Sequence, residues 1–80
     1  MRVKIFVSLK NGVLDPQGKA IERSLHTLSY IEVRDVRTGK YLEIEIDAAS
    51  RAAAEARVRE MCDKLLANPV IEDYRFEIQE

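Results

Sequence analysis

Two side chains in this sequence have the reactivity that catalysis usually requires, His26 and Cys62. An imidazole can act as a general base, and a thiol becomes a nucleophile when its surroundings lower its pKa. His26 follows Leu25 in an expected helix and lies off the apolar stripe, with no carboxylate or nucleophile predicted beside it. Cys62 lies between Met61 and Leu65 on the apolar stripe of a second expected helix. The sequence therefore favours a surface histidine and a buried, structural cysteine over a Cys–His dyad.

Three acidic residues, Glu43, Glu45 and Asp47, alternate along an expected strand and could suggest metal ligands. Neighbours on one face of a strand are roughly 7 Å apart. Pairing with opposing lysines explains the presence of these acidic residues more simply than a metal ion does. A single cysteine and a single histidine also cannot complete a tetrahedral zinc site. We expect a solvated acidic face and no metal site.

The segment from Asn11 to Gly18 places two glycines and an Asp-Pro pair before an expected helix. Glycines beside a helix N-terminus can bind an anion through backbone N–H groups. Here Asp15 is the expected N-cap, and its negative charge competes for the same amides. No glycine-rich dinucleotide or P-loop motif is present. The segment is better explained as a capped turn that serves as a docking surface, and we expect no active site and no bound cofactor in this chain.

Size and charge limit what the protein can be. Eighty residues form a single domain, 1–80, with a small core and a thin stability margin. One cysteine excludes a disulfide within the chain and no metal site is expected, so association with other chains is the remaining source of added stability. A homodimer or larger assembly is therefore expected. The net charge of −1 argues against a nucleic-acid partner. The N-terminal residues alternate apolar and polar types, which excludes a signal sequence or membrane anchor there and favours a cytoplasmic protein.

Periodicity predicts four strands and two helices. Alternation marks strands at residues 3–9, 31–37, 41–47 and 73–78, while Asp15-Pro16 and Ser50 begin helices that end near Tyr30 and at Ala67. Gly39 is expected in a tight hairpin turn between the two middle strands.

The element order β-α-β-β-α-β is typical of the α+β, ferredoxin-like fold, a four-stranded antiparallel sheet with two helices on one face. The apolar stripes of both helices should then face the core; they are Ile21, Leu25 and Leu28 in the first, and Ala54, Val58, Met61, Cys62 and Leu65 in the second. The opposite face should carry Lys4, Phe6, Ser8, Tyr41, Glu43 and Glu45.

Two motifs resemble one known family over essentially the whole chain. They are VSLK followed by GVLDPQG at residues 7–18, and LANPVIEDY at residues 66–74, with Val36-Arg37, Gly39-Lys40 and Glu43 between them. The sequence resembles the PurS family, the small subunits of phosphoribosylformylglycinamidine synthase. Ser29 departs from the family, where glycine is common before the following aromatic residue or histidine.

The resemblance implies a non-catalytic subunit that bridges a glutaminase and a synthetase subunit and supports ammonia transfer in the fourth step of de novo purine synthesis. ATP and magnesium would bind the synthetase subunit. We expect the two motif segments to contact these partners. The candidate contact residues are Gln17, Glu72 and Asp73, together with Arg37 and Lys40 of the expected hairpin.

Two other readings share the predicted topology. An ACT-like regulatory module would bind an amino acid at the junction between the first strand and helix, which Gly12 to Leu14 permits. An RNA-recognition domain would stack bases on sheet aromatics, but only Phe6 and Tyr41 are available and the charge is unfavourable.

Overall fold

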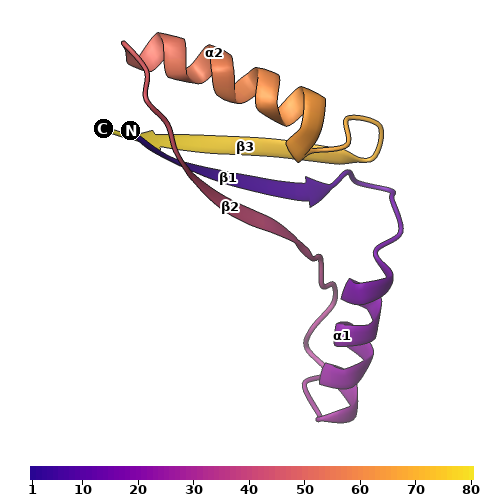
Figure 1. The fold of residues 1–80 in the computed structure, drawn as a ribbon. Helices are drawn as coiled ribbons and strands as arrows, with labels where there is room; N and C mark the ends of the chain where they lie inside the picture. Colours follow the sequence, from indigo (N-terminus) through magenta and orange to yellow (C-terminus); the bar gives the residue numbers. More distant parts are fainter.

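The computed structural model describes residues 1–80 as one three-stranded sheet, one helix packed on it and one helix that projects from its end (Figure 1). The elements in chain order are β1 (Arg2–Leu9), α1 (Pro16–Thr27), β2 (Gly39–Glu45), α2 (Arg51–Met61), a π-helical turn η1 (Cys62–Leu66) and β3 (Glu72–Gln79). None of the helices is both long and apolar enough to span a membrane.

The sheet is antiparallel in the order β2-β1-β3, so the first strand lies at its centre. Ile5 pairs with Leu42 on β2 and with Phe76 on β3. Side chains alternate between the faces of a strand, so Val3, Ile5 and Val7 all point to the face that α2 covers. These three residues form the core with five others, Ala54, Val58, Cys62, Ala67 and Ile78.

The expected four-stranded ferredoxin-like sheet is wrong, because residues 31–37 do not form a strand. This segment returns along α1 instead of joining the sheet, and Val33 and Val36 are half-buried there. Gly39 is therefore the first residue of β2 and not the centre of a hairpin turn. Period-two alternation indicates that a segment can adopt an extended conformation, but it does not indicate which surface the segment packs against.

Helix α1 also departs from the prediction, since it does not pack on the sheet beside α2. It projects from the end of the sheet opposite the chain termini (Figure 1), which makes the molecule 51 Å long and only 14 Å thick. The predicted stripe of Ile21, Leu25 and Leu28 consequently has no core to face, and Leu28 is 67% exposed. We call residues 14–38, which comprise α1 and the returning segment, the arm.

Helix α2 follows the prediction for most of its length. The Ser50 side chain accepts a hydrogen bond from Ala53 N at 3.1 Å, as an N-cap does. Ala54, Val58 and Cys62 are fully buried, as expected. The last turn is wider, with Ala67 N donating to Cys62 O, five residues back. Leu65 leaves the predicted buried stripe as a result and is 81% exposed.

The sheet face opposite α2 is open and carries the side chains predicted for it. Phe6 lies beside Tyr41, with ring centroids 5.1 Å apart, and the Arg75 guanidinium lies 4.0 Å from the centroid of the Phe6 ring. Lys4 is paired in register with Glu43 on one side and Glu77 on the other. This face mixes charges with a short aromatic row, so it suits solvent or a polar partner.

Candidate functional site

The junction of the arm with the sheet is organised around Asp15. Its side chain caps α1 by accepting from Gly18 N at 2.9 Å. It also accepts from Thr38 N at 2.6 Å and from the Thr38 hydroxyl at 3.0 Å. The backbone hydrogen bond from Thr38, followed by that from Gly18, lowers the pKa of Asp15. One buried carboxylate thus joins the start of α1 to the residue that precedes β2.

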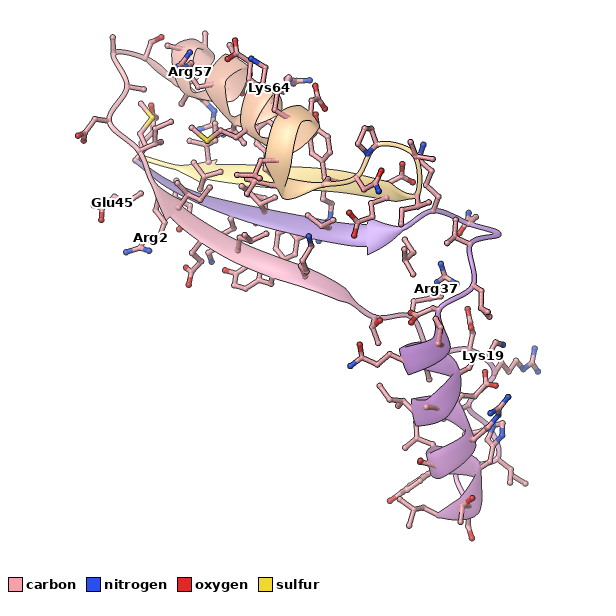
Figure 2. The ribbon with its side chains drawn as sticks, turned by 45° about the vertical axis from the view of Figure 1, so that its right-hand side comes forward. Arg2, Lys19, Arg37, Glu45, Arg57 and Lys64 are labelled. Atoms are coloured by element: carbon pink, nitrogen blue, oxygen red, sulfur yellow. The ribbon has the colours of Figure 1, made fainter.

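Arg37 holds the other side of the same junction (Figure 2). Its guanidinium donates to Val13 O at 2.9 Å, to Lys10 O at 3.1 Å and to Leu9 O at 3.4 Å. These carbonyls belong to the end of β1 and the turn that leads to α1, and the planar fork of arginine can satisfy them together. Arg37, one of the predicted contact residues, therefore fixes the direction in which the arm leaves the sheet.

Three of the five candidate contact residues, Gln17, Lys40 and Glu72, line one open hollow beside this junction. Its volume is about 320 Å³, and the lining is completed by Leu9, Thr38 and Gly39. The two motif segments, which are far apart in the chain, meet here through Gln17 and Glu72. We call this feature the junction hollow.

Two charged side chains of the junction hollow also hold the scaffold together. The Lys40 ammonium donates to Leu66 O at 3.1 Å. Leu66 ends η1, and a positive charge stabilises the C-terminal end of a helix. The Glu72 carboxylate accepts from Asn68 N at 2.6 Å and closes the loop before β3. Gln17 makes no side-chain hydrogen bond within the chain, so its amide is the group most available to a partner.

Asp73 lies next to the junction hollow but not in it. It lines a second hollow of about 250 Å³ between η1 and β3, together with Lys10, Asp63 and Tyr74. The Tyr74 hydroxyl donates to Asp63 at 3.0 Å. Burial, and then this bond to Asp63, raises the pKa of Tyr74. Glu72 lines both hollows, so Asp73 belongs to a surface that adjoins the junction hollow.

The two residues considered for catalysis lie in different parts of the molecule. His26 is exposed on the arm, where its Nε2 lies 2.7 Å from Val33 O and fastens the returning segment to α1. Cys62 is fully buried beneath α2. Burial, and then the negative charge of Asp63, raises the pKa of the Cys62 thiol, which is the opposite of what activates a nucleophile. The predictions of a surface histidine and a buried cysteine are confirmed.

Sequence reasoning missed two residues of the junction. Gly18 lies in the first turn of α1, and a Cβ there would collide with the backbone carbonyl of Val36 and come within 2.8 Å of Asp15 Oδ2. Thr38 supplies two donors to Asp15. Glycine is an unfavourable residue within a helix, and Gly18 follows the N-cap by three positions. Its presence there is the one sign in the sequence that another segment approaches the helix closely.

Comparisons with known proteins agree with the sequence motifs. The family model for PurS, phosphoribosylformylglycinamidine (FGAM) synthase, matches residues 2–80. The PurS subunit of the Bacillus subtilis synthase is 56% identical over 79 residues, covering 99% of this chain and 93% of that protein. The B. subtilis PurS crystal structure superposes with a TM-score of 0.89 over 99% of this chain and 98% of that one. A chain of the Thermotoga maritima PurLQS structure is 34% identical, with a TM-score of 0.87 over 95% and 93%. This chain belongs to the PurS family, the small subunits of the FGAM synthase of purine biosynthesis.

Proposed function

We propose that this chain bridges the glutaminase and synthetase subunits of FGAM synthase, and that the junction hollow and the adjoining surface at Asp73 form part of the docking surface. The observation that carries the proposal is the meeting of the two motif segments at one place, through Gln17 and Glu72. The T. maritima PurLQS structure, in which a similar chain occurs, supports assembly with larger chains.

The chemistry of the site suits recognition. It offers an amide at Gln17, a cation at Lys40 and carboxylates at Glu72 and Asp73, all of which can form hydrogen bonds across an interface. Arg37 and Asp15 set the orientation of the elements that carry these groups. In this proposal ATP, magnesium and the ribonucleotide bind the synthetase subunit, and this chain supports ammonia transfer without binding a cofactor. A cytoplasmic location is part of the proposal, supported by a single free cysteine that suits a reducing compartment.

Reconstitution tests the proposal. Adding this chain to the glutaminase and synthetase subunits should restore glutamine-dependent turnover, while ammonia-dependent turnover by the synthetase should need it far less. Gln17→Ala, and separately Asp73→Lys, should raise the concentration of this chain needed for half-maximal glutamine-dependent turnover. Both positions are exposed, so the isolated fold should keep its stability within about 0.5 kcal/mol.

Asp47→Lys is the matched control, because this exposed residue lies just beyond the far end of β2 from the junction hollow. It should leave assembly unchanged. The proposed surface is wrong if Gln17→Ala and Asp73→Lys both assemble at wild-type concentrations. The bridging role itself is wrong if glutamine-dependent turnover does not need this chain.

A further inference from the structure

The turn that leads from β1 to the arm contains the dipeptide Asn11-Gly12, which has a chemistry of its own. When glycine follows asparagine, the glycine nitrogen can attack the side-chain amide carbon, because no side chain on the glycine obstructs the approach. Both residues are exposed here, and Gly12 adopts a φ of 87°, a conformation that suits glycine. A Cβ built on Gly12 would meet no heavy atom within 4 Å. The space beside the attacking residue is therefore open.

The two groups that would react are not engaged elsewhere in the chain. The backbone hydrogen bond of the turn runs from Val13 N to Lys10 O at 3.1 Å, and Gly12 N donates none. The Asn11 side chain makes no hydrogen bond within the chain either. Nucleophile and amide are both free to rotate into contact.

The other amide side chains that could follow this course are blocked. Asn68 is the only other asparagine, and its successor Pro69 has no N–H to serve as the nucleophile. Gln17 also precedes a glycine, but its longer side chain would have to close a less favourable six-membered ring. Gly18 N is in addition already bonded to the Asp15 carboxylate at 2.9 Å. The chemistry is therefore confined to the turn after β1.

We propose that Asn11 deamidates spontaneously in the folded chain and that the isoaspartyl product loosens the arm. Gly12 N loses its proton to solvent and bonds to Asn11 Cγ, while the Cγ–Nδ2 bond breaks and the side-chain nitrogen takes a proton from solvent and leaves as ammonia. One water then opens the five-membered succinimide. Opening at Cγ gives aspartate, and opening at the backbone carbonyl gives isoaspartate, whose main chain runs through Cβ and Cγ. The net reaction is hydrolysis of one amide and needs no oxidant or reductant.

The position of this turn gives the modification a structural effect. The Arg37 guanidinium donates to carbonyls on both sides of Asn11-Gly12, Lys10 O at 3.1 Å and Val13 O at 2.9 Å (Figure 2). An isoaspartyl link adds one carbon to the main chain between these carbonyls, so they no longer fit one guanidinium. The new carboxylate also competes for Arg37, because a charge-assisted hydrogen bond is roughly twice as strong as a neutral one. Both effects release the contacts that fix the direction of the arm.

Ageing the intact chain tests the site. The folded protein, and the same protein unfolded in guanidinium chloride, are incubated at physiological temperature and mildly alkaline pH, and their peptides are followed by mass spectrometry. The peptide with Asn11 should gain the mass difference between an amide and an acid at a rate within about tenfold of the unfolded chain, because the turn has one backbone hydrogen bond to open. The peptide with Asn68 should not change. An isoaspartyl methyltransferase used as a probe should methylate the aged chain.

Hydrogen exchange tests the effect on the arm. Asn11→Ser is the matched control, since it removes the reacting amide and leaves Gly12 in place. After ageing, amides of residues 14–38 should exchange at least about fivefold faster in the deamidated wild type than in Asn11→Ser, while peptides of β1 and β3 should exchange alike. Freshly purified Asn11→Asp adds the charge without lengthening the main chain and should accelerate exchange less.

Three results would overturn the proposal in whole or in part. An Asn11 amide that persists in the folded chain while it converts in guanidinium chloride would show that the fold protects the site. A deamidated chain whose arm exchanges as slowly as that of Asn11→Ser would refute the structural effect. Equal acceleration in Asn11→Asp would refute the role of the longer main chain.

Discussion

Gly18→Ala tests whether the junction depends on the close approach of the returning segment to α1. Two effects oppose each other at this position. Alanine is a better helix former than glycine by about 1 kcal/mol, so helix propensity alone predicts a more stable arm. The added Cβ, however, would collide with the backbone carbonyl of Val36 and crowd the Asp15 carboxylate.

The steric effect should win. Overpacking costs about 1–3 kcal/mol, and the cost lies toward the upper end when the obstacle is backbone, which cannot move away as a side-chain tip can. Moving Val36 would also pull Thr38 from Asp15. We expect the arm to lose about 1–2 kcal/mol, which corresponds to roughly 5- to 30-fold faster amide exchange if the arm opens locally.

Hydrogen exchange followed by mass spectrometry, on peptides covering residues 14–38, measures this directly. Peptides from β1 and β3 provide an internal reference, since α1 contacts the sheet only at its N-terminal end. Ser24→Ala, at an exposed position of the same helix, is the matched control and should slow exchange slightly. Exchange in Gly18→Ala that is as slow as in the wild type would show that Val36 can shift at no cost and would refute the steric argument.

Three further predictions concern single residues. Ser29 adopts a φ of 76° where the helix ends, with Tyr30 N donating to Leu25 O, so Ser29→Gly should stabilise the arm by about 1 kcal/mol in urea unfolding, and unchanged stability would argue against strain there. The pKa of Asp15 is lowered in the folded state, so the stability that its carboxylate contributes is fully present above the unfolded pKa near 3.8 and is lost as the pH falls through the folded pKa. Asp15→Asn should remove this part of the acid dependence of amide exchange in the arm. An unaltered pH profile of exchange would contradict the role given to Asp15. Cys62→Ala should cost about 1–2 kcal/mol in urea unfolding and leave the glutamine-dependent turnover of the reconstituted complex intact, whereas normal assembly with lost turnover would reveal a chemical role.

The sequence predicted local structure well where one surface determines the pattern. Val3, Ile5 and Val7 alternate because β1 has a single buried face, and Asp15 and Ser50 cap their helices as expected. The open face of the sheet was likewise predictable from the alternate positions of β1 and β2.

The errors arose where an apolar pattern faces something other than the chain's own core. Ile21, Leu25 and Leu28 have the spacing of a buried stripe, but that spacing is the same whether the covering surface comes from this chain or another. Residues 31–37 were predicted as a strand from their alternation. The hydrogen bonds of Arg37 and Thr38 that hold the end of this segment join positions far apart in the chain, so spacing does not reveal them. The five candidate contact residues remain predictions, although the meeting of Gln17, Lys40 and Glu72 at one hollow could not be foreseen from spacing alone.

The central position of β1 has a consequence for how the protein is made. Arg2, in the first strand of the chain, pairs with Gln79, in the last strand. Contacts between such distant positions form slowly, because a long loop must close before they contribute. On the ribosome, β1 therefore keeps one edge unpaired until β3 has been synthesised, and an unpaired strand edge can join other chains. We expect nascent chains truncated before residue 72 to aggregate rather than fold.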